Sequence, residues 1–213
     1  MPSGTILTAG IDVGGARKGF HAVVFRNGAY QANFASREAV EIVRWCQAQG
    51  AQVVGVDAPS GWSEDGRARP SERALMQAGI SCFASPTRVA ARMHPKNYFG
   101  WMLCGEELFA VLQESYALFD GQAPLEQSRL CFETYPHGIA CALAGEPVSA
   151  REKRQVRRRL LEGAGVDTAA LSNIDELDGA LCALAAYRFV CGEYVSYGGV
   201  GCSSIVLPRL ALG

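Results

Sequence analysis

The sequence lacks the cysteine patterns of a disulfide scaffold or a zinc site. Its eight cysteines are scattered, with no Cys-x-x-Cys pair and no zinc-type histidine partner. Cys182, for example, lies in the apolar run Leu181–Leu184, where a free cysteine behaves as a small hydrophobic side chain. The cysteines therefore indicate buried, reduced thiols, as expected in a reducing compartment.

Long apolar runs and an excess of charge of either sign are also missing. No stretch approaches the roughly 20 apolar residues that a membrane span needs, and the N-terminus has no charged segment followed by a hydrophobic one. We therefore expect a cytoplasmic protein without membrane contact. The formal net charge is −1, so a polyanion could bind only at a local basic cluster. The basic residues are mostly arginines, because Lys18, Lys96 and Lys153 are the only lysines.

The chain is long enough for one full hydrophobic core. Its 213 residues are 49% hydrophobic and 19% charged, which is typical of a globular protein. We expect a single domain over residues 1–213, with a polar, arginine-rich insertion at about residues 62–100. Hydrophobic periodicity predicts helices at 37–49, 71–77, 103–119 and 152–162, and an edge strand or packed arm at 204–208.

Two predicted strands end in an aspartate that small residues follow. Asp12 lies in the glycine-rich segment Gly10–Gly15, and the β-branched run Val53–Val56 leads directly to Asp57. Such a run favours a central, buried strand, and open α/β sheets bind ligands at the carboxyl ends of these strands. Either aspartate alone could instead stabilise a turn or a cap. As a pair they predict a site for a divalent cation or a cation-bridged phosphate.

A late helix carries two further acids. Asp175 and Asp178 are three residues apart, so their side chains share a face near the helix start. Acids on a first turn also complement the helix dipole. Asp178, however, lies on the small-residue face that must pack on the sheet, and Gly179 indicates a close backbone approach. A buried acid needs a partner, and a metal shared with Asp12 would supply one.

Basic residues gather in two segments. The insertion contains Arg69 among several arginines, which bind phosphate in a bidentate manner. The helix at 152–162 carries Lys153 and Arg157 on one face, where they could clamp a backbone phosphate. Both segments could equally be solvated surface.

Four short motifs together resemble a known family. They are G-I-D-V-G-G-x-x-K-G at 10–19, V-D-A-P-S-G at 56–61, E-T-Y-P at 133–136 and D-E-L-D-G-A-L at 175–181. This set is similar to the bacterial and archaeal domain-of-unknown-function 429 family, which is predicted to contain RNase H-like nucleases. The first and last motifs also resemble those of Holliday-junction resolvases. Gly179 stands where the family usually has Ala, and Glu72 stands where it usually has Asp.

The resemblance implies an RNase H-like α/β fold of three layers, α/β/α. Its mixed sheet has five strands in the order 3-2-1-4-5, with strand 2 antiparallel. The acids that meet over such a sheet correspond to Asp12, Asp57 and Asp178, with Asp175 as an additional acid. Glu133 matches the family's E-x-x-P motif as a neighbour. The fold family is also compatible with a homodimer.

The residues and the resemblance agree on an acidic cluster, and oxygen-only ligation selects Mg²⁺ or Mn²⁺. We therefore expect metal-dependent hydrolysis of phosphodiester bonds in DNA or RNA, with Asp12 bridging two ions and Asp57, Asp175 and Asp178 completing their shells. Lys18 and the basic helix would hold the substrate backbone. Two alternatives stay open: a non-catalytic nucleic-acid or protein-binding module, and an actin-like ATPase or phosphotransferase.

Overall fold

A computed structural model describes residues 4–121, 129–149, 151–199 and 203–209. The strands are β1 (Leu7–Val13), β2 (Phe20–Arg26), β3 (Ala29–Ser36), β4 (Val53–Asp57), β5 (Ala117–Leu118), β6 (Leu130–Glu133), β7 (Tyr194–Tyr197) and β8 (Ile205–Pro208). The helices are α1 (Ala39–Ala48), α2 (Pro70–Gln77), α3 (Arg88–Met93), α4 (Gly100–Leu112), α5 (Pro136–Ala144), α6 (Lys153–Gly163) and α7 (Ile174–Val190).

The strands form one mixed sheet in the order β3-β2-β1-β4-β6-β8-β7, and β5 also pairs with β6. Strand β2 is antiparallel to β1 and β3, whereas β1, β4, β6 and β8 are parallel. The expected antiparallel second strand is present, but the expectation of five strands in the order 3-2-1-4-5 was wrong, because the sheet has eight strands. The additional strands β5, β7 and β8 have only two to four residues each, too few for a clear periodic signal.

The C-terminal segment at 204–208 is not an edge strand. β8 lies between β6 and β7, and all four of its residues are buried. Ile205 and Leu207 of β8 pack in the hydrophobic core together with residues of α7. The strand at this edge of the sheet is β7.

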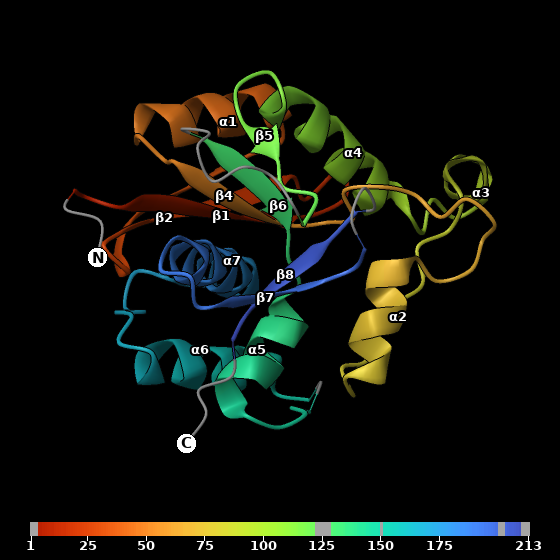
Figure 1. The fold of residues 1–213 in the computed structure, drawn as a ribbon. Coiled ribbons are helices and arrows are strands. Elements are labelled where there is room, and N and C mark those ends of the chain that lie inside the picture. The colour runs from red at the N-terminus through yellow and green to blue at the C-terminus, as the bar shows by residue number, and fades with distance from the viewer. Residues whose placement is uncertain (1–3, 122–128, 150, 200–202, 210–213) are drawn as a thin grey trace.

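Helices cover both faces of the sheet (Figure 1). Helices α1 and α4 pack on one face against Ile11, Val54 and Val56. Helix α7 lies across the other face, and α5 and α6 pack beside it. A methyl group on Gly10 of β1 would lie 2.0 Å from the backbone nitrogen of Ala183 in α7, so only glycine permits this approach.

Several helices begin or end at other residues than the sequence predicted. Helix α1 begins at Ala39, because Ser36 accepts a hydrogen bond from the amide of Glu38 rather than capping a helix from 37. The helix predicted at 103–119 begins at Gly100 and ends at Leu112, since the chain turns and enters β5. Pro136, in the motif at 133–136, opens α5, because the backbone nitrogen of the first helical residue has no hydrogen bond to make within the helix.

The cysteines in the described part of the chain are free, but only four of the seven are buried, namely Cys46, Cys131, Cys141 and Cys182. Cys202 lies outside the described residues. Within the same residues, every helix is too short or too polar to cross a membrane.

Candidate metal centre

Three potential ligands lie in one row across the sheet. Asp12 of β1 is the register partner of His21 on the antiparallel strand β2 and of Asp57 on the parallel strand β4. Register partners on neighbouring strands project from the same face of a sheet. Here that face is the one that α7 covers, because Ile11 and Val56, one residue earlier, project into the opposite core.

Helix α7 delivers the fourth and fifth ligands to this row. The Asn173 side chain accepts hydrogen bonds from the amides of Asp175 and Glu176, and so fixes where the helix begins. A methyl group on Gly179 would lie 2.9 Å from the carbonyl oxygen of His21, which confirms the predicted close approach. Asp178 therefore reaches the sheet, and one carboxylate oxygen from each of Asp12, Asp57 and Asp178 lies within 4.8 Å of the others.

A second group overlaps the first. Asp12, His21 and Asp175 also offer ligand atoms within 4.8 Å of one another, so Asp12 belongs to both groups. His21 was missed in the sequence, because only the register of β1 against β2 brings it beside Asp12.

Two basic side chains enter the cluster. The Lys18 ammonium lies 2.5 Å from a carboxylate oxygen of Asp175 and 3.5 Å from Oδ2 of Asp12. Arg157 of α6 forms an ion pair with Asp178, and both side chains are almost fully buried. We expected Lys18 and Arg157 to bind a substrate, whereas here each neutralises part of the acidic cluster.

The environment shifts the protonation of these groups. Burial raises the pKa of Asp178 to about 7, although the nearby Arg157 opposes the shift. Burial and the charges of Asp12 and Asp178 hold the pKa of Asp57 well above its ordinary value. Burial also raises the pKa of Asp12, against the opposing effect of Lys18. For Lys18, burial would lower the pKa, but the hydrogen bond with Asp175 and the charge of Asp12 raise it overall. The acids are therefore crowded and short of positive charge.

The donor set fits a hard divalent cation. Asp12 is only 5% exposed, and its Oδ2 atom accepts no hydrogen bond; its basic neighbour there is Lys18, in an ion-pair contact at 3.5 Å. Three buried carboxylates this close together are costly, and a cation shared among them would offset their repulsion. Asp12, Asp57 and Asp178 are thus able to hold such an ion.

A family model described as "Protein of unknown function (DUF429)" matches residues 10–200. The chain belongs to the DUF429 family. No curated protein matches the sequence. Among solved structures, the Thermus thermophilus RuvC structure is similar, with 16% sequence identity and a TM-score of 0.44 over 93% of this chain and 99% of that chain.

In this DUF429 protein, Glu133 lies apart from the acidic row. Its register partner on β4 is Val56 rather than Asp57, so it projects from the opposite face of the sheet. Glu133 receives two hydrogen bonds from Arg69, at 2.6 and 2.9 Å, and two from Ser60, at 2.8 and 3.0 Å. Its carboxylate is thus already paired.

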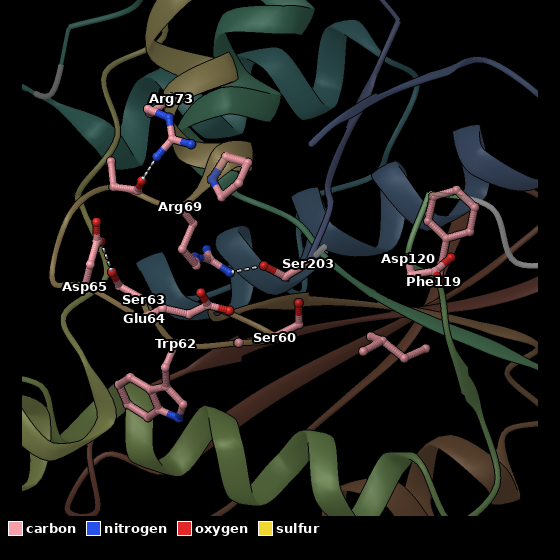
Figure 2. Close-up of a pocket in the computed structure, with 14 residues that line it drawn as sticks. Ser60, Trp62, Ser63, Glu64, Asp65, Arg69, Arg73, Phe119, Asp120 and Ser203 are labelled. Carbon is pink, nitrogen blue, oxygen red and sulfur yellow. Dashed lines mark hydrogen bonds between the residues drawn. The ribbon is translucent and has the colours of Figure 1, made fainter. Parts of the chain in front are cut away.

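Arg69 is the centre of a buried ionic network. Besides Glu133, its guanidinium contacts Glu72 at 2.8 Å and Ser203 at 2.9 Å. Glu72 also accepts hydrogen bonds from the amide and hydroxyl of Ser85. Figure 2 shows Arg69 reaching from the start of α2 toward Ser203. The network therefore holds the segment between β4 and α4, which we predicted as an insertion, against the carboxyl end of β6.

A pocket of about 560 Å³ lies beside this network (Figure 2). Its charged lining has both signs, with Arg69 and Arg73 beside Glu64 and Asp65. Asp12, Asp57 and Asp178 do not line it. A smaller hollow of about 60 Å³ includes both Asp57 and Glu133, so it connects the network to the acidic row.

The basic helix α6 is mostly committed to internal contacts. Arg154 and Arg158 donate hydrogen bonds to the backbone carbonyls of Ser172 and Leu171, which precede α7. Arg157 is paired with Asp178, whereas Lys153 is exposed. The face with residues 153 and 157 therefore carries an exposed cation next to a buried one.

Proposed function

We propose that this protein is a metal-dependent nuclease with an RNase H-like fold, which hydrolyses phosphodiester bonds in DNA or RNA. The mixed sheet with β2 antiparallel to β1, covered by helices on both faces, supports an α/β fold of this class. The convergence of three carboxylates from β1, β4 and α7 is the observation that carries the activity.

In this proposal Asp12, Asp57 and Asp178 hold a divalent cation, and Asp175 extends the acidic cluster. Oxygen-only ligation by these carboxylates suits Mg²⁺ or Mn²⁺. When bound, such a cation activates water and stabilises the charge that develops on the leaving oxygen. The acids themselves fix the position of the ion on rigid elements, which strands β1 and β4 and helix α7 provide.

The basic and insertion residues would act on the substrate side. Lys153 is exposed at the start of α6, whose Arg157 contacts Asp178, so an anionic backbone could approach the acids along this helix. Arg69 and Glu133 would position the insertion rather than contact the reacting phosphate, because they are buried and bonded to each other. A cytoplasmic location and a homodimer remain predictions.

The direct test is cleavage of labelled single-stranded, duplex and branched DNA and RNA with Mg²⁺ or Mn²⁺. Asp178→Asn is the test variant, and Asp167→Asn is the matched control, because Asp167 is exposed and lies outside both ligand groups. The proposal expects cleavage by the wild type and by the control only. Cleavage that Asp178→Asn retains would contradict it.

One observation favours the binding-module alternative. Lys18 and Arg157 neutralise part of the cluster with the protein's own side chains, as in an acidic site that has only a structural role. A folded wild-type protein that binds Mn²⁺ but cleaves none of the substrates would favour this alternative.

A further inference from the structure

The two ligand groups are not equivalent in charge. Asp12, Asp57 and Asp178 are three carboxylates, whereas Asp12, His21 and Asp175 are two carboxylates and an imidazole. Because Asp12 is shared, two ions could in principle lie side by side, one in each group. The positions of the basic side chains distinguish the groups.

Lys18 occupies the second group. Its ammonium lies between Asp175, at 2.5 Å, and Oδ2 of Asp12, at 3.5 Å. These are the two carboxylates that a second ion would have to share. A positive charge is therefore already present at that position.

The turn after β1 holds Lys18 in place. The amide of Gly14 bonds to the carbonyl of Gly19, and the amides of Lys18 and Gly19 both bond to the carbonyl of Gly15. A methyl group on Gly14 would lie 2.8 Å from both Cβ and Cδ of Lys18. The absence of a side chain at position 14 thus leaves room for the lysine stem to extend toward the acids.

The balance of charges also indicates that the site has room for one divalent ion. When ionised, the four aspartates of the two groups carry four negative charges, against two positive charges from Lys18 and Arg157. One divalent ion cancels the remainder. A second ion would leave an excess of positive charge at a partly buried site unless Lys18 moved away, and an ion beside an ammonium group is repelled.

We propose that Lys18 serves as a built-in cation in place of a second metal ion, so that the site binds one divalent ion, at Asp12, Asp57 and Asp178. This inference rests on the proposed metal site and differs from our sequence-based expectation that Asp12 bridges two ions. Lys18 acts here as a positioning residue that keeps Asp12 and Asp175 oriented.

The test is the number of Mn²⁺ ions bound per chain, measured by titration calorimetry and by electron paramagnetic resonance. We expect one ion for the wild type and one for Lys18→Arg, which keeps the charge. Lys18→Met removes the charge but keeps an apolar stem, and we expect it to bind two ions. Adding His21→Ala to Lys18→Met should return the number to one, because the second group loses its imidazole.

The outcomes separate the two proposals. No bound ion in folded wild-type protein would overturn the proposed metal site itself. Two ions in the wild type would overturn only the role of Lys18, as would a single ion in folded Lys18→Met. The wild-type count decides the matter even where Lys18→Met does not fold.

Discussion

Asp12 and Asp57 are register partners on adjacent parallel strands, so their carboxylates extend from the same face of the sheet at its carboxyl edge. Two like charges in this arrangement repel each other, and Asp178 from α7 adds a third. This repulsion lowers the stability of the folded protein, and a bound divalent cation would remove the repulsion and so stabilise the fold.

The first prediction concerns Asp57, whose carboxylate is crowded by Asp12 and Asp178. Asp57→Asn removes a charge from the cluster, so we expect the metal-free protein to gain about 1 kcal/mol in the free energy of unfolding. The same change removes an ion ligand, so binding of Mn²⁺ should be lost. Denaturant unfolding and calorimetry measure the two effects. A less stable variant that still binds Mn²⁺ normally would contradict the account.

The second prediction is a pH dependence. The pKa of Asp178 is about 7 in the folded protein, against an ordinary value of 3.8, so the folded state keeps a proton that the unfolded state releases. The free energy of unfolding of the metal-free protein should therefore fall as the pH rises between these values. Ion binding needs the deprotonated carboxylate, so Mn²⁺ affinity should rise with pH up to about 7 and level off above it.

Thermal unfolding across this pH range, with a chelator and with Mn²⁺, tests both trends. The stabilisation by Mn²⁺ should grow as the stability of the metal-free protein declines. A stabilisation by Mn²⁺ that does not change with pH would argue against ligation by Asp178.

The third prediction separates Arg157 from Lys153 on the same helix. Arg157 is buried against Asp178, whereas Lys153 is exposed. We expect Arg157→Gln to cost about 3 kcal/mol of stability, because it leaves a buried carboxylate unpaired. Lys153→Gln should change stability by less than about 0.5 kcal/mol. Mn²⁺ should restore much of the loss in Arg157→Gln, because the ion replaces the missing positive charge.

Urea unfolding of both variants, with and without Mn²⁺, provides the comparison. Equal losses of unfolding free energy in the two variants would show that the ion pair with Asp178 does not stabilise the fold.

The fourth prediction concerns Arg69, which pairs with both Glu72 and Glu133. Arg69→Met should cost about 3–5 kcal/mol, because two buried carboxylates lose their partner. Helix α2 should then exchange its amide hydrogens much faster, since the network no longer holds it to the sheet. Arg67→Met is the control, because Arg67 is exposed. Unchanged exchange in α2 would contradict a tethering role for Arg69.

The sequence contained enough information to bring Asp12, Asp57 and Asp178 together. Asp57 ends β4 after a β-branched run, Asp12 lies one residue before the end of β1 in a glycine-bounded segment, and Asp178 lies on a helix face of small residues that must pack closely. These are local patterns, and parallel strands share an edge whatever their exact register. The structure therefore agrees with the sequence on the grouping of these acids.

Other features depend on non-local pairing. The position of Glu133 on the opposite face follows from its register with Val56, and a shift of one residue would reverse it. His21 joins the cluster only through the antiparallel register of β1 and β2. The pairing of Arg157 with Asp178 depends on how α6 packs on α7, and no local spacing encodes that packing.

The most direct test of the central claim is anomalous diffraction from crystals of the protein soaked in Mn²⁺. The account predicts one anomalous peak in contact with carboxylate oxygens of Asp12, Asp57 and Asp178, while Lys18 remains beside Asp175. Well-ordered crystals with no peak between these three acids, and with Arg157 still paired to Asp178, would contradict the account.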